Sequence, residues 1–270
     1  MAYLGKDVRI HRLMPEGDNY YFGIAVDHSI ARGIMPGLDH IDDTLAKLVA
    51  GGPNALTMHK GIAEKCYGPH AGKVPLVLKC TTFSPYHFAT DVPVASVEEA
   101  VRLGADAVSV GCIVGGDNQP EQMGNLARYA KAAAEFGMPL VSHIYPRGNL
   151  IPDEDRNSWK HVAYATRMAA ELGVDFIKTH YTGDPDSFAK VVEATPSRVL
   201  VAGGEMGETV EDYIKMTRDV IDAGGRGVTY GRFVFTYKNP TALVKTLYAV
   251  IHKGVGVKEA LEYLEYLENN

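Results

Sequence analysis

A repeating alternation of strand-like and helical segments constrains the fold of this chain more than any single motif. Short apolar runs of the kind that form buried strands recur eight times, each followed by helical sequence or, after the second, by a less regular segment. Near-continuous apolar strands joined through helices indicate a parallel sheet, and eight such units close a (β/α)8 barrel. The runs occupy residues 20–29, 54–61, 75–83, 106–114, 139–148, 175–183, 198–204 and 227–233.

The segments between the runs carry helix start and stop signals, and one helix follows the last unit. Ser96 with Glu99 forms a capping box, whereas residues 84–93 have the character of a long loop. No break in composition divides the chain, so we predict a single barrel domain over residues 1–270. The predicted helices cover 41–50, 96–104, 119–136, 159–172, 209–223 and 241–252, with an additional C-terminal helix at 257–267.

A doubly wound open sheet is the alternative architecture. It would usually show a glycine-rich fingerprint after the first strand, and residues 25–33, AVDHSIARG, lack one. The composition, 46% hydrophobic and 22% charged, is that of a globular protein with an ample core. A formal net charge of −6 argues against nonspecific binding to nucleic acid or a membrane surface.

The three cysteines, Cys66, Cys80 and Cys112, are widely spaced and show no metal-site or disulfide pattern. No apolar run reaches membrane-spanning length, and the N-terminal sequence has no continuous hydrophobic region. These features predict a cytoplasmic protein with reduced thiols.

Alternation along the strands predicts which side chains face the barrel interior, because successive residues of a strand point to opposite sides. In the sixth run, Lys178 shares its side with Phe176, while Ile177 and Thr179 face the helices. Active sites of such barrels lie at the carboxyl ends of the strands. The inward residues at those ends are Asp27, His59, Lys79, Tyr145, Lys178 and His180.

Lys178 is the residue around which this set is arranged. Burial of a lysine disfavours its ammonium form, which lowers its pKa and frees an amine that can attack a carbonyl and form a Schiff base. A lysine at a strand end with its ammonium in water is the alternative. Lys79 either lowers the Lys178 pKa by like-charge proximity or pairs with Asp27 in the barrel mouth.

Two glycine-containing pairs end the last two strands, where barrels of this type often bind phosphate. Gly203 and Gly204 follow the seventh run, and Gly231 with Arg232 ends the eighth. Each pair alone reads as an ordinary turn, but their occurrence on neighbouring strands favours an anion site. An amine, a phenol, a carboxylate and a phosphate site together suit carbon–carbon bond chemistry on a phosphorylated carbonyl compound, with Lys178 forming the imine, Tyr145 exchanging a proton and Asp27 orienting the reacting groups.

Two other classes of function fit part of this pattern. A metal-dependent lyase would use histidines near the strand ends, His28, His59, His143 and His180, although no paired ligand spacing occurs. A sugar-phosphate binding protein without catalysis would keep the glycines but would not need inward-facing Lys178 and Tyr145.

The motifs resemble those of the archaeal-type class I fructose-bisphosphate aldolases in the DeoC/LacD-like superfamily, with their relatives 2-amino-3,7-dideoxy-D-threo-hept-6-ulosonate synthase and autoinducer-2 phosphate thiolase. The resemblance runs from about residue 24 to 264. It rests on AVDHS around Asp27, NALTMHKGI from Asn54, EEAVRLGADAVSV from Glu98, YPRG from Tyr145, DFIKTHYTGD around Lys178 and VAGG ending at Gly204.

This resemblance implies a (β/α)8 barrel, no metal or other cofactor, a Schiff-base lysine at Lys178, an acid/base tyrosine at Tyr145 and an aspartate at Asp27. It also implies a homo-oligomer, often a decamer of two pentameric rings. Three positions depart from the family pattern: Ser29 replaces a usual glycine, His143 with Ile144 replaces a tryptophan–serine pair, and Phe233 replaces a polar residue. The loss of that polar side chain near the expected phosphate site argues against a bisphosphate substrate and is compatible with a ketose monophosphate.

The sequence therefore predicts a metal-independent Schiff-base aldolase acting on a phosphorylated ketose. A transaldolase-like synthase or a thiolase using the same lysine is the alternative. The predicted binding residues are Lys79, His59, Arg147, His180, Gly203, Gly204, Gly231 and Arg232.

Overall fold

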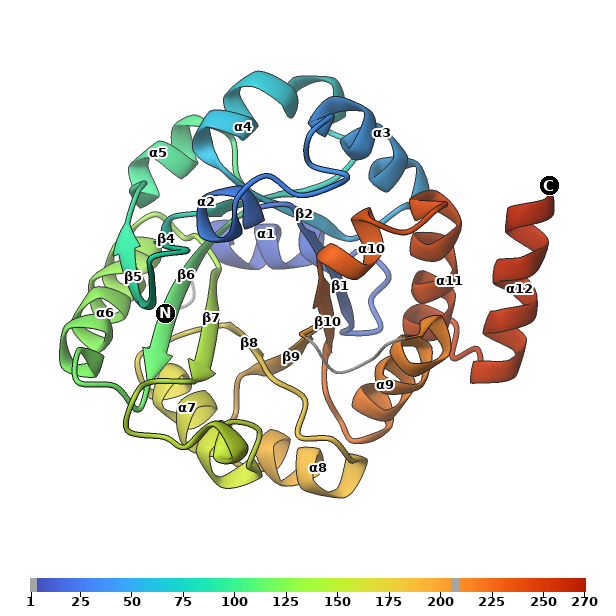
Figure 1. Cartoon of the computed structure of the whole chain (residues 1–270). Coiled ribbons are helices and arrows are strands. Elements are labelled where there is room, and N and C mark those ends of the chain that lie inside the picture. The colour runs from blue at the N-terminus through green and yellow to red at the C-terminus, as the bar shows by residue number, and fades with distance from the viewer. Residues whose placement is uncertain (1–3, 205–208) are drawn as a thin grey trace.

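Eight parallel strands form a closed barrel in the computed structural model, which describes residues 4–204 and 209–270 (Figure 1). Around the barrel the strands follow the order β1-β10-β9-β8-β7-β6-β3-β2. The predicted (β/α)8 architecture is confirmed. The strands are β1 (Tyr21–Ala25), β2 (Ala55–His59), β3 (Leu76–Lys79), β6 (Ala107–Val114), β7 (Leu140–Pro146), β8 (Phe176–Thr179), β9 (Arg198–Ala202) and β10 (Gly227–Tyr230).

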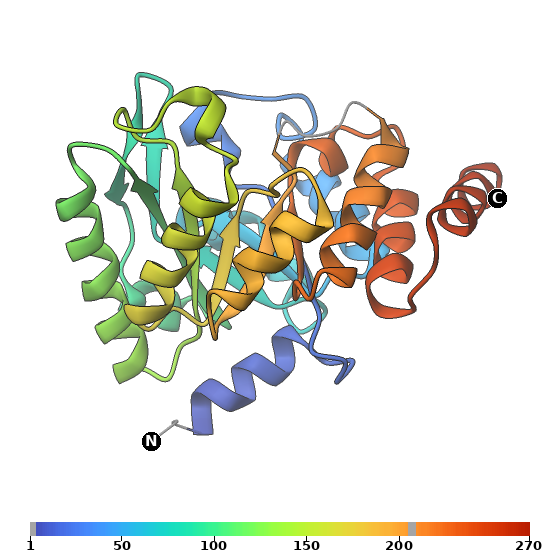
Figure 2. The ribbon, with the colours of Figure 1, turned by 90° about the horizontal axis from the view of Figure 1, so that it is seen from below.

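Helices form the outer ring of the barrel, and N-terminal capping residues mark where several of them begin. The capping box of Ser96 and Glu99 is present at α5, and Thr209 with Asp212 forms another at α9. The additional C-terminal helix, α12, packs against α11 and α9 (Figures 1 and 2). The ring comprises α3 (Ile41–Gly51), α4 (Lys60–Cys66), α5 (Val97–Arg102), α6 (Gln119–Glu135), α7 (Trp159–Glu171), α8 (Pro185–Glu193), α9 (Val210–Asp222) and α11 (Pro240–His252), with α12 (Val257–Asn269) outside it.

Two apolar layers confirm the predicted alternation of the strands. Phe176, Val77 and Val141 belong to a cluster inside the barrel, whereas Ile177 and Leu78 belong to the larger layer between the strands and the helices. Burying a side chain of this kind stabilises the fold by about 1.5–3 kcal/mol. Apolar side chains therefore fill the barrel near the amino ends of the strands, and the polar residues lie nearer the carboxyl ends.

The N-terminal segment closes the lower end of the barrel, which its polar sequence did not indicate. Helix α1 (Leu4–Leu13) lies across the amino ends of the strands (Figure 2). Leu13 and Met14 join the inner cluster with Tyr21 and Phe176. Only one edge of α1 is apolar, so the helix shields the barrel floor while its other side faces solvent.

The prediction of a long loop at residues 84–93 is wrong. Beyond β3 the chain forms an antiparallel hairpin of β4 (Thr81–Ser84) and β5 (His87–Pro93), so the predicted strand 75–83 is divided at Cys80. The first predicted run is also shorter, because the short helix α2 (His28–Arg32) begins directly after Asp27. A second short helix, α10 (Arg232–Phe235), follows β10.

Over the same described residues, none of the helices is both long and apolar enough to span a bilayer. The predicted cytoplasmic location itself stays a prediction.

Candidate active site

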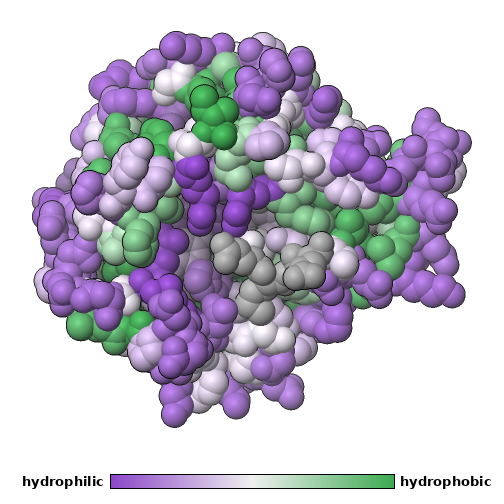
Figure 3. Space-filling view, viewed as in Figure 1, coloured by the Kyte–Doolittle hydropathy of each residue, from purple (hydrophilic) through white to green (hydrophobic). Residues whose placement is uncertain are grey.

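A cavity opens at the carboxyl ends of the strands, and polar side chains surround the hollow in the middle of the barrel mouth (Figure 3). The predicted site residues Asp27, Lys79, Tyr145, Arg147, Lys178, His180, Gly203, Gly204, Gly231 and Arg232 all line it. The cavity also takes side chains that the sequence did not single out, including Arg32, Phe83, Asp91, Tyr213 and Thr229.

Lys178 lies near the end of β8 with its side chain directed into this cavity. Its residue is only 7% exposed. Burial lowers the pKa of its ammonium group, Asp27 opposes that shift and Lys79 adds to it, so that the pKa is about 8. A substantial fraction of Lys178 is thus a neutral amine near neutral pH, which is the form that attacks a carbonyl.

Asp27 follows β1 and lies beneath the cavity opening, with one carboxylate oxygen 3.6 Å from Nδ1 of His28. Burial alone would raise the pKa of Asp27, but His28, Lys79 and Lys178 together hold it below its ordinary value. Burial also lowers the pKa of His28 to about 4, so this ring is neutral near pH 7. Lys79 and the protonated fraction of Lys178 therefore favour the ionised carboxylate near neutral pH.

Tyr145 extends from β7, beside Lys178 in the strand order. Its ring lies 4.7 Å from that of His180, and the Arg147 guanidinium lies 5.1 Å from the Tyr145 ring centroid. Burial raises the pKa of the Tyr145 phenol well above its ordinary value. The hydroxyl consequently keeps its proton at neutral pH and can serve as a general acid.

The glycines of the predicted anion site follow the carboxyl ends of the neighbouring strands β9 and β10. Gly204 has φ of 54°, a left-handed conformation that glycine adopts without strain. Arg232 lies in the same wall of the cavity. Phe233 stacks on Tyr213 with their ring centroids 3.6 Å apart, which makes this part of the wall aromatic rather than polar.

His59 is the one predicted site residue that the structure does not bring to the cavity lining. It ends β2 and is buried with Nδ1 3.2 Å from the carbonyl oxygen of Lys79. Burial lowers the pKa of its ring. His59 is in register with Lys79, which lines the cavity, yet its own side chain stays outside the lining, and the alternation pattern does not distinguish these two outcomes.

Asp91, which the sequence reasoning missed, reaches the cavity from the hairpin. Its carboxylate accepts a hydrogen bond from the Thr81 hydroxyl at 2.8 Å, and that hydroxyl accepts one from the Gly111 N–H at 2.7 Å. A Cβ at Gly111 would lie 2.3 Å from the carboxyl atoms of Asp91. Glycine at this inward position of β6 was the available signal, since it leaves room for a group from elsewhere.

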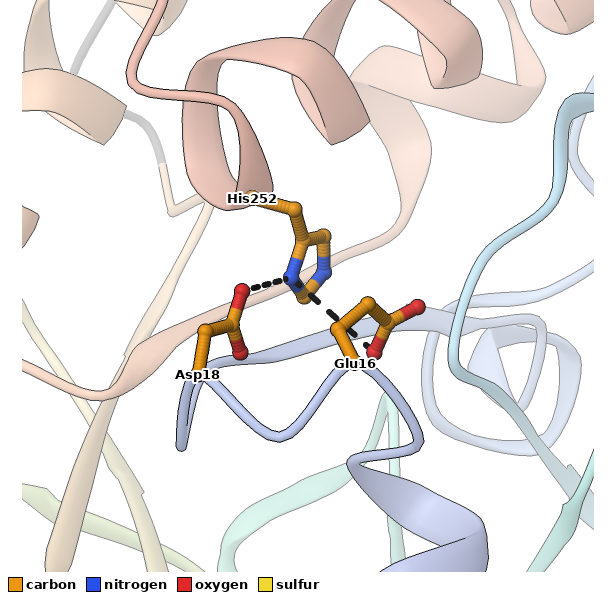
Figure 4. Close-up of side chains that lie close together, drawn as sticks. All are labelled: Glu16, Asp18 and His252. Atoms are coloured by element: carbon orange, nitrogen blue, oxygen red, sulfur yellow. Dashed lines mark hydrogen bonds and ion pairs between the residues drawn. The ribbon is translucent and has the colours of Figure 1, made fainter.

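The histidines of the metal alternative do not form a ligand cluster. In residues 4–204 and 209–270, the only group of three such side chains with close ligand atoms is Glu16, Asp18 and His252, at the amino ends of the strands (Figure 4). Hydrogen bonds already engage this group. His252 Nδ1 lies 2.7 Å from Asp18, its Nε2 lies 2.9 Å from Asn54 Oδ1, and Asn54 donates to Glu16 at 2.9 Å.

Comparison with known proteins decides the family. Residues 22–237 match the model of the DeoC/LacD family aldolases. The chain belongs to this family. It is 36% identical over 265 residues to 2-amino-3,7-dideoxy-D-threo-hept-6-ulosonate synthase of Halobacterium salinarum, with 97% of each chain covered. It is 35% identical over 246 residues to fructose-bisphosphate aldolase class 1 of Thermoproteus tenax, covering 88% of this chain and 92% of the relative.

Solved structures of the family agree with the fold. An archaeal fructose 1,6-bisphosphate aldolase matches with a TM-score of 0.81 and 32% identity, covering 91% of this chain and all of the other. Another solved structure of an archaeal fructose-1,6-bisphosphate aldolase, with the catalytic lysine covalently bound to the carbinolamine intermediate of the substrate, matches with a TM-score of 0.80 and 32% identity over 90% of this chain and 99% of the other. The predicted class I aldolase assignment is confirmed by this membership.

Proposed function

We propose that this protein is a Schiff-base aldolase for a phosphorylated ketose, with Lys178 as the nucleophile. The observation that carries the proposal is a buried lysine, with its pKa lowered to about 8, in a cavity that also holds Asp27, Lys79 and Tyr145. The relatives named for fructose-bisphosphate cleavage support a substrate of this class.

The reaction begins when the neutral Lys178 amine attacks the ketone carbon and forms a carbinolamine. Loss of water gives a protonated imine, which acts as an electron sink. The bond between the α- and β-carbons then breaks, its electron pair moves into an enamine, and the β-hydroxyl loses its proton as an aldehyde forms. Protonation of the enamine carbon and hydrolysis release the ketone and restore the amine.

Tyr145 and Asp27 handle the protons of this cycle. The protonated Tyr145 hydroxyl relays the proton of the cleavage: it gives its own proton to the enamine carbon and takes the β-hydroxyl proton in exchange. In condensation it donates to the developing alkoxide and takes up the proton that leaves the α-carbon. The ionised Asp27 lies near Lys178 and assists proton movement while water is lost from the carbinolamine. Without Tyr145 the imine would still form, but its conversion to products would be slower.

The phosphate of the ketone half binds at the ends of β9 and β10. Glycines 203, 204 and 231 permit a close approach of the backbone, and Arg232 supplies a charge-assisted contact. The product of this half is then dihydroxyacetone phosphate. The stacked rings of Phe233 and Tyr213 line this wall of the cavity and add no charge to it.

A transaldolase-like synthase or a thiolase on the same lysine is the second candidate. The 36% identity to 2-amino-3,7-dideoxy-D-threo-hept-6-ulosonate synthase, close to the 35% identity to the bisphosphate aldolase, favours neither substrate over the other. Both functions use the same lysine imine and differ in the half of the substrate that leaves or joins.

The resemblance to the family supports two further proposals, on the oligomeric state of the protein and on the bounds of its domain. We propose a homo-oligomer, with a decamer of two pentameric rings as the expected form, from a chain that folds as one domain over residues 1–270. Light scattering coupled to gel filtration measures the mass directly, and a protein that elutes with the mass of one chain at micromolar concentration refutes the assembly.

Turnover with a panel of ketose phosphates tests the reaction. The panel compares fructose 1,6-bisphosphate with ketose 1-phosphates, and a coupled assay measures dihydroxyacetone phosphate. We expect activity with at least one member, and irreversible inactivation by borohydride only while that substrate is present. Loss of activity to a chelator, with no effect of borohydride, would instead indicate metal-dependent cleavage.

A further inference from the structure

The cavity wall at the ends of β9 and β10 is held by aromatic side chains that lie outside the barrel strands. Tyr213 of α9 donates a hydrogen bond from its hydroxyl to the carbonyl oxygen of Gly204, at 3.5 Å. The ring of Phe233, in α10, stacks on the Tyr213 ring with an angle of 1° between the two planes. Arg232 directly precedes Phe233, so this stacked pair joins the turn after β9 to the turn after β10.

The C-terminal helix α12 contacts the segment that follows α10. The ring of Tyr237 lies 6.3 Å from that of Phe233. Its hydroxyl donates a hydrogen bond to Oε1 of Glu268 at 2.6 Å, and Nζ of the adjacent Lys238 lies 2.7 Å from Oε2. Lys238 and Tyr237 hold the pKa of the Glu268 carboxyl below its ordinary value, so it is ionised at neutral pH. A hydrogen bond to an ionised acceptor is stronger than one between neutral groups.

Helix α12 is fixed to the rest of the protein by its apolar side. It stands outside the ring of helices and packs on α9 and α11, with Ala260 and Leu264 as its buried residues (Figure 1). Glu268 lies four residues after Leu264 and hence on the same side of the helix. The burial of Leu264 therefore carries the Glu268 carboxylate to the segment after α10.

We propose that Glu268 is a positioning residue, which fixes α10 through Tyr237 and so holds Arg232 in place for the phosphate group of the ketone. This assignment rests on the proposed function, which locates that phosphate at the ends of β9 and β10. A wall that is already ordered binds its ligand without the entropy cost of ordering it. Helix α12 therefore sets the affinity for phosphorylated ketones and leaves the imine chemistry of Lys178 unchanged.

Borohydride trapping with two ketones tests this assignment. Dihydroxyacetone phosphate carries the phosphate and dihydroxyacetone lacks it, while both offer the same carbonyl group to Lys178. We expect Glu268→Ala to lower the second-order rate constant of trapping roughly fivefold for the phosphorylated ketone and to leave it unchanged for the other. The maximal trapping rate at saturating dihydroxyacetone phosphate should stay the same, because the amine and its surroundings are intact. Equal changes for the two ketones, or no change, overturn the assignment.

Two conservative variants follow the contact itself. Glu268→Gln keeps an oxygen that accepts from Tyr237 and should retain most of the affinity, whereas Tyr237→Phe removes the donor and should match Glu268→Ala. The double variant of Tyr237→Phe and Glu268→Ala should be no weaker than either single variant, because the same hydrogen bond is lost in all three. Effects that add in the double variant mean that Glu268 does not act through Tyr237, and they overturn the assignment.

Glu262→Ala is the matched control on the same helix. The Glu262 side chain is exposed, and its carboxylate lies 3.9 Å from Nζ of Lys258, so the change removes a glutamate and an ion pair that lies within α12. The trapping rates of this variant should equal those of the unmodified protein for both ketones. A loss as large as that of Glu268→Ala would show a general effect of α12 and would overturn the role of Glu268.

A binding measurement separates this inference from the proposed function. If borohydride traps no adduct on Lys178, the proposed function fails, but calorimetric titration of the Lys178→Met protein with dihydroxyacetone phosphate still measures recognition without chemistry. We expect Glu268→Ala in that background to weaken binding roughly fivefold. Binding that Glu268→Ala leaves unchanged, or that is already absent from the Lys178→Met protein, overturns the positioning role of Glu268.

Discussion

The two ends of the barrel hold clusters of polar side chains that differ in one respect. At the floor, Glu16, Asp18 and His252 lie together and join the end of α11 to the segment before β1 (Figure 4). Asn54 completes this cluster, whose members are connected by hydrogen bonds. At the mouth, buried polar atoms have no such partners in the described residues; they include His28 Nδ1, His143 Nε2, Arg147 Nε and Thr229 Oγ1. Polar groups that hydrogen-bond to one another, as at the floor, stabilise the fold. Buried polar groups without such bonds, as at the mouth, can bind a ligand instead.

Replacing the central amine of the mouth should have the largest effect. Lys178→Met removes the only group that forms the imine in this account, so turnover should fall below detection. Because the change also removes the cost of burying an ammonium group, the melting temperature should stay the same or rise. Turnover is measured with the preferred ketose phosphate and unfolding by calorimetry. Retained turnover, or a clear loss of stability, would place Lys178 among the structural residues.

Tyr145→Phe should reduce activity less completely. Loss of a general acid typically costs about 10²–10⁴ in rate, and the remaining residues still form the imine. Single-turnover kinetics should therefore show a normal rate of borohydride trapping with a slow release of product. If trapping and turnover fall together, Tyr145 acts in imine formation instead of proton transfer to the substrate.

The floor should respond in the opposite way. His252→Ala removes the hydrogen bonds that the ring makes with Asp18 and Asn54 and should lower the free energy of unfolding by about 1–3 kcal/mol. kcat and KM should not change, because the cluster lies at the other end of the barrel from Lys178. Denaturant unfolding and steady-state kinetics on the same preparation give both values. A change in KM without a change in stability would reverse the contrast between the two ends.

The smallest expected effects are shifts in the pH profile of imine formation. The rate should rise through pH 8 as Lys178 loses its proton. Asp27 raises the Lys178 pKa, so Asp27→Asn should move the rise to lower pH; Lys79 lowers it, so Lys79→Met should move the rise to higher pH. The trapping rate as a function of pH measures both. Shifts in the same direction for the two variants would contradict this electrostatic arrangement.

Regular alternation made most of the fold predictable. The barrel and the inward and outward sides of its strands follow from the periodicity of short segments. The capping box at Ser96 follows from the residues of one helix end. Lys178, Tyr145 and Asp27 were found because each stands at the inward side of a strand end.

Contacts between distant segments were not predictable in the same way. Asp91 reaches the cavity only because the segment after β3 folds into a hairpin and Gly111 leaves space on another strand. The N-terminal segment covers the floor through Leu13 and Met14, with Ile10 packed against them, and charged residues stand between these apolar positions. His59 lies on the inward side of β2 but does not line the cavity. The position of each of these side chains depends on how elements that are far apart in the sequence pack together, and a local sequence pattern does not predict such packing.

The central claim is that Lys178, and not the neighbouring Lys79, is the nucleophile. Both amines line the same cavity, so loss of activity in a variant does not separate them. Borohydride reduction in the presence of dihydroxyacetone phosphate, followed by peptide mass mapping, does. The account predicts one reduced adduct, on the peptide that carries Lys178, absent from Lys178→Met. An adduct on Lys79, or on any other residue of the unmodified protein, would contradict it.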